Sequence, residues 1–215
     1  MKRLGAAHGR LADVLPAEER HRLAEAMFFD VLAKMNRAKT IDATMVVTAD
    51  DAVARHADWL GHDVLKQSDD AGHSHAAAAG ARAALTAGVD RVAMLPADCP
   101  LLDPAELDDA LGRTPRAALI VPDRHRTGTN ALVLSPPDAF EPAFGPDSCA
   151  RHVSRARAAG ISFALQAIES LALDLDTPED MRDLRDALLL DPAPGPRTAQ
   201  VLWELGPRIE QVALA

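Results

Sequence analysis

Three aspartates offer the clearest chemistry in this sequence. Asp98 follows a short apolar run, and the pair Asp174 and Asp176 follows another, directly before a predicted helix. Open α/β sheets bind their ligands beyond the carboxyl ends of the strands, so these carboxylates are expected to meet in one cleft. They predict a hard divalent cation such as magnesium, held by one or two carboxylates together with substrate phosphates. For Asp176, a plain helix cap remains an open alternative.

A second set of polar residues is suited to an anionic ligand. Ser148 precedes a predicted helix, so its hydroxyl and the amides of the first helical turn would form an anion site aided by the helix dipole. Gly145 would let the backbone approach a phosphate or carboxylate closely. Ser148 is equally suited to be an ordinary helix cap, and one residue can do both. Thr129 and Asn130 begin a predicted strand, where they could also be ordinary turn residues.

The elements that must position these residues alternate along the chain. Apolar runs predict strands, and helical spacing with start and stop signals predicts helices. Strands are expected at 43–47, 63–66, 91–95, 117–121, 130–134, 161–165 and 171–173. Helices are expected at 15–35, 50–60, 75–88, 104–111, 148–159 and 178–190, with a further helix over 198–213 that is interrupted at Gly206-Pro207. This alternation predicts a largely parallel sheet with helices on both faces.

Length and composition exclude several classes of protein. A chain of 215 residues is long enough for one core and short for two domains. The net charge of −9 argues against sequence-independent nucleic-acid binding, which needs a basic surface. No apolar run suggests a membrane span or a signal peptide, so we expect a cytoplasmic protein. Cys99 and Cys149 lack metal-ligand spacing and are expected to be packed thiols.

The predicted domain covers residues 1–190. Residues 191–215 form a Pro-rich linker and a C-terminal helical tail.

Four separated motifs, in this order, resemble those of a known family. They are Leu95-Pro96-Ala97-Asp98-Cys99-Pro100-Leu101, Arg126-Thr127-Gly128-Thr129-Asn130-Ala131-Leu132, Phe144-Gly145-Pro146-Asp147-Ser148 with His152 following, and Asp174-Leu175-Asp176-Thr177-Pro178-Glu179-Asp180. The block Lys2-Arg3-Leu4-Gly5-Ala6-Ala7-His8-Gly9-Arg10-Leu11 also matches the family's opening loop. Together these motifs make the sequence similar to the 2-phospho-L-lactate and phosphoenolpyruvate guanylyltransferases, which act in biosynthesis of the deazaflavin coenzyme F-420.

The resemblance implies a three-layer αβα, Rossmann-like nucleotidyltransferase fold of the glycosyltransferase-A type with a mostly parallel sheet. It implies transfer of a guanylyl group from GTP to a small phospho-acid, with release of pyrophosphate. Magnesium would be bound by Asp98, Asp174 and Asp176. The nucleotide would contact Lys2, Arg10, Gly72, His73 and Asp98, and the acceptor would contact Thr129, Asn130, Gly145 and Ser148. GTP and the acid are the expected partners, and a homodimer is left open.

The chemistry of such a transfer is independent of the resemblance. The acceptor phosphate oxygen attacks the α-phosphorus, and both reactants are strongly anionic. Their repulsion must be neutralised, which magnesium ions can do without any protein nucleophile.

Two departures from the family's pattern concern the N-terminus. Family members begin with a strand before the opening loop, whereas here Met1 directly precedes Lys2. We therefore expect a gap in the sheet and a true start upstream of Met1. His8 replaces a lysine of the opening loop, and a neutral imidazole cannot replace an ammonium beside a triphosphate.

Other basic residues have open roles. His73 and His75 could be read as a metal pair, but the sequence offers no third ligand. Arg124 and Arg126 are as consistent with a solvated loop as with phosphate contact.

Rival functions remain at this stage. The acceptor could be phosphoenolpyruvate, 2-phospho-L-lactate or 3-phosphoglycerate, which differ by few atoms. A nucleotidyltransferase for a molybdopterin or sugar phosphate is one alternative, although its usual Gly-rich loop is absent here. A catalytically weakened nucleotide-binding protein is another, but retention of three mutually repelling carboxylates argues against it.

Overall fold

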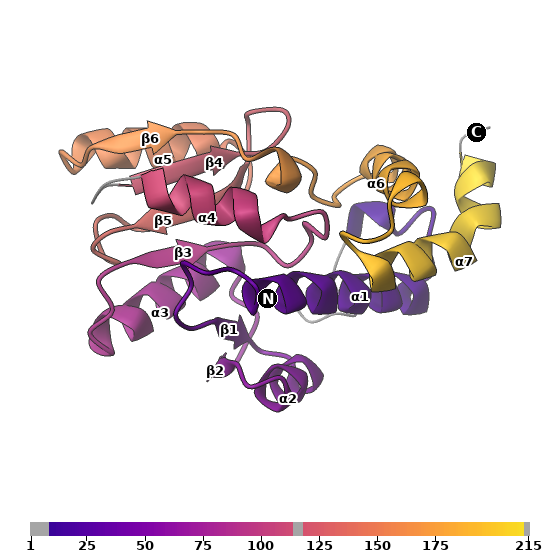
Figure 1. The fold of residues 1–215 in the computed structure, drawn as a ribbon, viewed down its shortest axis with the longest axis horizontal. Coiled ribbons are helices and arrows are strands. Elements are labelled where there is room, and N and C mark those ends of the chain that lie inside the picture. The colour runs from indigo at the N-terminus through magenta and orange to yellow at the C-terminus, as the bar shows by residue number, and fades with distance from the viewer. Residues whose placement is uncertain (1–8, 114–117, 213–215) are drawn as a thin grey trace.

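The computed structural model describes residues 9–113 and 118–212, and its elements alternate largely as the sequence predicts (Figure 1). The helices are α1 (Ala17–Met35), α2 (Asp51–Trp59), α3 (His73–Thr86), α4 (Pro104–Arg113), α5 (Ser148–Ala158), α6 (Pro178–Leu190) and α7 (Pro196–Val212). Two short 3-10 helices are η2 (Gly9–Leu11) and η3 (Glu169–Leu171). The strands are β1 (Met45–Thr48), β2 (Asp63–Lys66), β3 (Val92–Met94), β4 (Ala118–Pro122), β5 (Thr129–Leu134) and β6 (Phe163–Leu165).

Local signals in the sequence account for several of these boundaries. The Asp50 side chain accepts hydrogen bonds from the amides of Ala52 and Val53 and so caps α2. Gly61 follows that helix with a φ of 82°, a backbone conformation that favours glycine. The 3-10 helix η3 ends at Leu171, and the predicted strand at 171–173 is not formed. Instead, the Asn130 side chain donates hydrogen bonds to the carbonyls of Leu171 and Ala172, and the Arg124 amide also donates to the Ala172 carbonyl.

The sheet is mixed, so the expectation of a mostly parallel sheet is wrong for the described strands. The order is β3-β5-β4-β6 in one sheet and β1-β2 in the other. The pairs β1–β2 and β4–β6 are parallel, whereas β5 runs antiparallel to both β3 and β4. The physical reason is the short loop 123–128 between β4 and β5, because parallel neighbours need a crossover of about a dozen residues or more.

Helices cover both faces of the four-stranded sheet. Side chains of β4 alternate between these faces. Leu119 and Val121 pack with α4, and Ala118 and Ile120 pack with α5. The sheet is therefore buried on both sides, and the ends of its strands are where polar groups can gather.

The C-terminal tail packs against the rest of the chain. Leu202 and Leu205 of α7 belong to one apolar cluster with residues of α1 and α6, such as Leu23 and Leu184. The predicted interruption at Gly206-Pro207 is wrong, because α7 continues through it, although Figure 1 shows the helix changing direction along its length. A proline inside a helix commonly bends it without ending it.

The two sheets are separated by a gap. A cavity of about 1800 Å³ is lined by β1 and β3 and also by apolar residues of α1 and α3. Within residues 9–113 and 118–212, no strand pairs with both β1 and β3. The expectation of a missing first strand concerns the start of the chain, and residues 1–8 lie outside the described part of the structure. Among the described helices, none is long and apolar enough to cross a membrane.

Candidate active site

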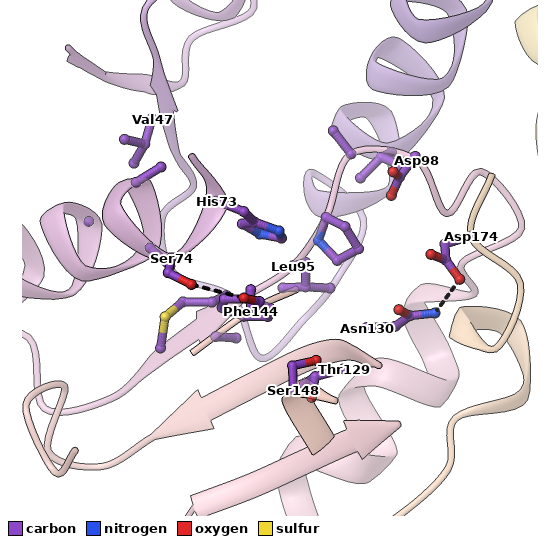
Figure 2. Close-up of a pocket in the computed structure, with 18 of the residues that line it drawn as sticks. Val47, His73, Ser74, Leu95, Asp98, Thr129, Asn130, Phe144, Ser148 and Asp174 are labelled. Atoms are coloured by element: carbon purple, nitrogen blue, oxygen red, sulfur yellow. Dashed lines mark hydrogen bonds between the residues drawn. The ribbon is translucent and has the colours of Figure 1, made fainter. Parts of the chain in front are cut away.

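The same cavity extends to the strand ends and collects the predicted site residues. Its lining includes the residues expected to bind metal, nucleotide and acceptor, namely Arg10, Gly72, His73, Asp98, Thr129, Asn130, Gly145, Ser148, Asp174 and Asp176. Lys2 and His8 lie outside the described residues. Figure 2 shows how side chains from separate loops surround this space.

Asp98 lies in the loop that follows β3, and contacts with other elements hold the backbone of this loop. The neighbouring Cys99 is fully buried, and its thiol lies 3.9 Å from the Leu171 carbonyl oxygen. Lys34 of α1 donates a hydrogen bond to the Pro100 carbonyl. Burial lowers the pKa of Lys34 to about 8, partly offset by the charge of Asp30. The backbone beside Asp98 is thus held by contacts with two other elements.

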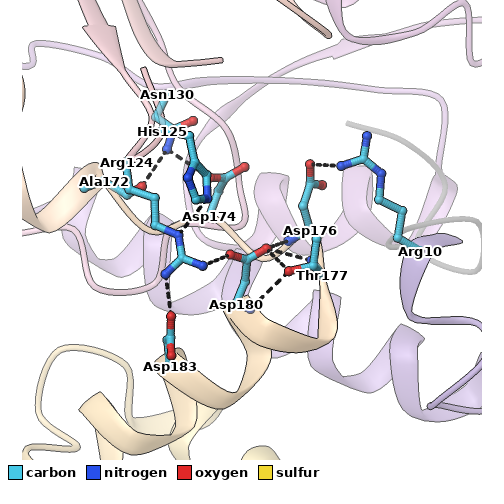
Figure 3. A network of polar contacts seen from close by, with 10 residues as sticks. All are labelled: Arg10, Arg124, His125, Asn130, Ala172, Asp174, Asp176, Thr177, Asp180 and Asp183. Atoms are coloured by element: carbon cyan, nitrogen blue, oxygen red, sulfur yellow. Dashed lines mark hydrogen bonds and ion pairs between the residues drawn. The ribbon is translucent and has the colours of Figure 1, made fainter. Parts of the chain in front are cut away.

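Asp174 and Asp176 lie between η3 and α6, and neither caps the helix. Thr177 is the cap: its hydroxyl accepts a hydrogen bond from the Asp180 amide, and the Asp180 carboxylate accepts one from the Thr177 amide. The alternative of Asp176 as a plain cap is therefore wrong. The Asp176 side chain instead forms a 3.0 Å ion pair with Arg10, and both side chains are more than half exposed (Figure 3).

The charges of the three aspartates raise the pKa values of groups near them. Burial raises the pKa of Asp174, a hydrogen bond from Asn130 opposes this, and the charge of Asp176 raises it further. Burial also raises the pKa of the Cys99 thiol, and the charges of Asp98, Asp174 and Asp176 add to that effect. Asp174 and Asp176 therefore repel each other, and a cation beside this pair would relieve the repulsion.

They do not form a complete metal cage. In the described ranges, no group of three or more His, Cys, Asp or Glu side chains is gathered closely enough to hold a metal ion. The pair His73 and His75 is likewise not part of such a group. A cation at the aspartates would therefore need further oxygen ligands from substrate or water, as is usual for magnesium.

Thr129 at the start of β5 is held by a buried histidine. His152 of α5 is fully buried, with its Nδ1 2.9 Å from the Thr129 hydroxyl and its Nε2 2.8 Å from the amide nitrogen of Ala143. An amide can only donate, so Nε2 accepts and the proton of the neutral ring resides on Nδ1. Nδ1 then donates to the Thr129 oxygen, which leaves the hydroxyl proton of Thr129 to be donated elsewhere.

The Asn130 side chain contacts the loop that carries Asp174 and Asp176. Its amide nitrogen donates to the Leu171 carbonyl at 2.8 Å and to the Asp174 carboxylate at 3.2 Å. The side chain predicted to hold the acceptor therefore points toward the predicted metal ligands.

Gly145 lies in the loop 135–147 between β5 and α5, which we call the acceptor loop, and Ser148 begins α5; both line the same cavity. Gly145 has a φ of 104°, which strongly favours glycine. Asp147, with a left-handed backbone, occupies the cap position, and the buried Ser148 is the first residue of the helix. Ser148 as a simple N-cap is thus wrong. Its position in the first turn is compatible with an anion site.

The loop that begins α3 contacts the acceptor loop directly. The rings of His73 and Phe144 stack with centroids 4.2 Å apart, and the Ser74 hydroxyl donates to the Phe144 carbonyl at 3.1 Å. The predicted nucleotide residue His73 therefore contacts the loop that also carries Gly145, a residue predicted to bind the acceptor.

Several structural partners were missed by the sequence analysis. Arg124 bridges Asp180 and Asp183 of α6, so its side chain joins the β4–β5 loop to that helix (Figure 3). Arg151 donates to carbonyls of the acceptor loop, including that of Ala143. His152 was noted only as following the third motif, and its hydrogen bond with Thr129 was not predicted.

Comparisons with known proteins show the family to which this chain belongs. A family model described as "Guanylyl transferase CofC like" matches residues 1–188. A phosphoenolpyruvate guanylyltransferase of Conexibacter woesei is 45% identical over 87% of this chain and 86% of its own. A 3-phospho-D-glycerate guanylyltransferase of Phenylobacterium zucineum is 38% identical over 94% of this chain and 92% of its own.

Among solved structures, a protein of Desulfovibrio desulfuricans G20, provisionally described as a nucleotide-diphospho-sugar transferase, superposes with a TM-score of 0.78. The match covers 98% of this chain and 94% of that chain at 20% identity, so it shows a shared fold.

Proposed function

This chain belongs to the CofC-like guanylyl transferase family, and we propose that it transfers GMP from GTP to phosphoenolpyruvate or 3-phosphoglycerate. The enzyme is a guanylyltransferase by family. The choice of these two acids is supported by the names of its relatives, and 2-phospho-L-lactate is the third candidate. The pathway would be biosynthesis of coenzyme F-420, in the cytoplasm, where GTP and such acids are formed.

The proposed reaction is a direct displacement. A phosphate oxygen of the acid forms a bond to the α-phosphorus of GTP, and the bond from that phosphorus to the bridging oxygen of pyrophosphate breaks. The products are a guanylylated acid and pyrophosphate. No side chain needs to act as a nucleophile.

Asp98, Asp174 and Asp176 are the proposed magnesium ligands. The donor set fits, because hard carboxylate oxygens suit this ion and their mutual repulsion favours a bound cation. When bound, magnesium would neutralise the phosphates of both reactants. Asn130 would hold Asp174 in place through its 3.2 Å hydrogen bond, and Arg10 could exchange its partner Asp176 for a GTP phosphate.

Thr129, Gly145 and Ser148 are proposed to bind the acceptor, with Asn130 beside them. His152 accepts from an amide on one side and donates to Thr129 on the other, which orients the threonine hydroxyl as a donor to an anion. Ser148 would contribute its hydroxyl, and the amides of the first turn of α5 would add their partial positive charge.

The nucleotide is proposed to lie against Gly72 and His73, with Lys2 and Arg10 toward its phosphates. Gly72 precedes α3 with a φ of 91°, so the backbone can turn closely around a ligand there. The stack of His73 on Phe144 would keep this region beside the acceptor loop.

The observation that carries the proposal is the joint presence, in one cavity of a chain from this family, of three carboxylates and of Thr129, whose hydroxyl is hydrogen-bonded by the buried His152. The test is release of pyrophosphate from GTP and magnesium with each of the three acids in parallel. Phosphoenolpyruvate or 3-phosphoglycerate should support the fastest release, and mass spectrometry should find the guanylylated acid. Release with a sugar phosphate or a molybdopterin alone, or binding of GTP without any transfer, would favour the rival functions.

A further inference from the structure

Two charged residues of α1 are buried without any role in the proposed chemistry. Asp30 is 4% exposed and Lys34 is 6% exposed. Charged side chains are rarely buried this far unless specific partners satisfy them. Because the two residues are four positions apart, they lie on the same face of the helix.

Lys34 is directed to the loop that carries Asp98. Its ammonium group donates a hydrogen bond to the carbonyl of Pro100, two residues after Asp98. Cys99, between Asp98 and Pro100, is fully buried, and its thiol lies 3.9 Å from the Leu171 carbonyl oxygen. A hydrogen bond from a charged donor is stronger than one between neutral groups, so Lys34 is a strong restraint on this backbone.

Asp30 is directed to the start of α7. Its carboxylate accepts hydrogen bonds from the Thr198 amide at 2.9 Å, the Thr198 hydroxyl at 2.7 Å and the Arg197 amide at 3.3 Å. The first amides of a helix have no partner within the helix, and a carboxylate there also interacts favourably with the helix dipole. The C-terminal helix is thus fixed to α1 at this residue.

The linker before α7 packs against both α1 and the Asp98 loop. A Cβ atom at Gly195 would lie 3.3 Å from the Pro100 carbonyl oxygen and 3.4 Å from an Asp30 carboxylate oxygen. The same carbonyl that receives the Lys34 hydrogen bond therefore packs directly against the linker. Residues far apart in the sequence, in α1, the Asp98 loop and the C-terminal tail, meet at one buried point.

We propose that Lys34 and Asp30 are positioning residues. Together with the C-terminal helix α7, they hold the Asp98 loop in its metal-binding arrangement. This inference rests on the proposed function, in which Asp98 binds magnesium. It gives helix α7, which lies beyond the residues 1–188 matched by the family model, a role in positioning the Asp98 loop. Small displacements of a ligand-bearing loop are costly, since partners that orient metal ligands are typically worth about 10-fold to 100-fold in metal affinity or activity.

The test compares Lys34→Met and Thr198→Val with a matched control. Lys34→Met removes the donor to Pro100 while keeping a long apolar side chain. Thr198→Val removes one hydrogen bond to Asp30 at nearly constant side-chain volume. It tests the contact between α1 and α7 even if Lys34→Met fails to fold. The control is Arg22→Met, which breaks the exposed ion pair between Arg22 of α1 and Glu204 of α7, away from the Asp98 loop.

Two readouts separate positioning from general stability. The first is amide hydrogen exchange of the segment 97–102 in the metal-free protein, which should be about 10-fold faster in Lys34→Met and faster by a smaller factor in Thr198→Val. The second is the magnesium concentration for half-maximal rate, which should rise about 10-fold in Lys34→Met with little change in the Michaelis constant of the acid. Arg22→Met should resemble the wild type in both.

The proposal is overturned if folded Lys34→Met and Thr198→Val keep wild-type exchange and magnesium dependence. It is also overturned if Arg22→Met changes both readouts to the same extent, because the effect would then be ordinary helix docking. Failure of the proposed function is distinguishable, since the wild type itself would not transfer GMP while the exchange comparison would still report on the junction.

Discussion

The buried His152 makes the stability of this protein dependent on pH in a defined window. Burial, together with the positive charges of Arg155, Arg151 and His73, lowers the pKa of this side chain from 6.5 to about 4. Protonation of Nε2 would also place an N–H group against the donating amide of Ala143. The folded state therefore resists protonation of His152, whereas the unfolded chain accepts the proton readily.

The sign and size of the effect follow from linkage. Between pH 6.5 and about 4 the unfolded state binds a proton that the folded state does not, so the free energy of unfolding falls as the pH falls. At about 1.4 kcal/mol per pH unit, His152 alone should lower the free energy of unfolding by about 3 kcal/mol across this window. Above pH 6.5 its contribution is constant, and below about pH 4 the loss is complete.

The assay is urea unfolding of the wild type and of His152→Gln at several pH values from 7.5 to about 4. The glutamine can still accept from an amide but does not titrate. It should be less stable than the wild type at pH 7.5, and its free energy of unfolding should fall less as the pH decreases, by about 3 kcal/mol. An NMR titration should place the pKa of His152 near 4. Parallel pH curves for the two proteins, or a measured pKa near 6.5, would refute this reasoning.

Further predictions concern the carboxylates, the acceptor site and the fold. Asp98→Asn and Asp176→Asn should stay folded but lose about 100-fold or more in guanylyl transfer, because a lost charge weakens transition-state stabilisation; near-normal turnover at saturating magnesium would contradict the metal assignment. Ser148→Ala should raise the Michaelis constant of the phospho-acid more than that of GTP in steady-state kinetics, whereas an equal rise for both would place this residue in the wrong half of the site. Asp180→Ala removes the reciprocal cap of α6 and the partner of Arg124, so thermal unfolding should show a loss of about 1–3 kcal/mol; an unchanged melting temperature would show that the cap contributes little.

Much of the secondary structure could be predicted because its signals are local. The strand at Asp63–Lys66 is observed with the predicted bounds, and α6 begins at Pro178 as expected. Capping residues, glycines after helices and apolar runs act within a few positions of where they occur, so their effect is readable without the fold. The prediction that Cys99 and Cys149 are packed thiols is confirmed, as both are free and buried.

Strand direction and side-chain partners were beyond local reasoning. Alternating elements suggested a parallel sheet, yet the short connection into β5 imposed an antiparallel pair. Arg10 and Asn130 were assigned to ligands by resemblance, but their side chains contact Asp176 and Asp174. A polar side chain takes the partner that the fold places within reach, and that partner can be more than 100 positions away in sequence, as for Arg10.

The sequence by itself determined which residues we propose for the site: the carboxylates Asp98, Asp174 and Asp176, together with Gly145 and Ser148. Only the tertiary structure decided that these residues line one cavity, that His152 orients Thr129, and that α7 is tied to the Asp98 loop through Asp30 and Lys34. The physical reason is that hydrogen bonds and charge interactions act over a few ångströms of space, whereas a sequence records distance along the chain alone.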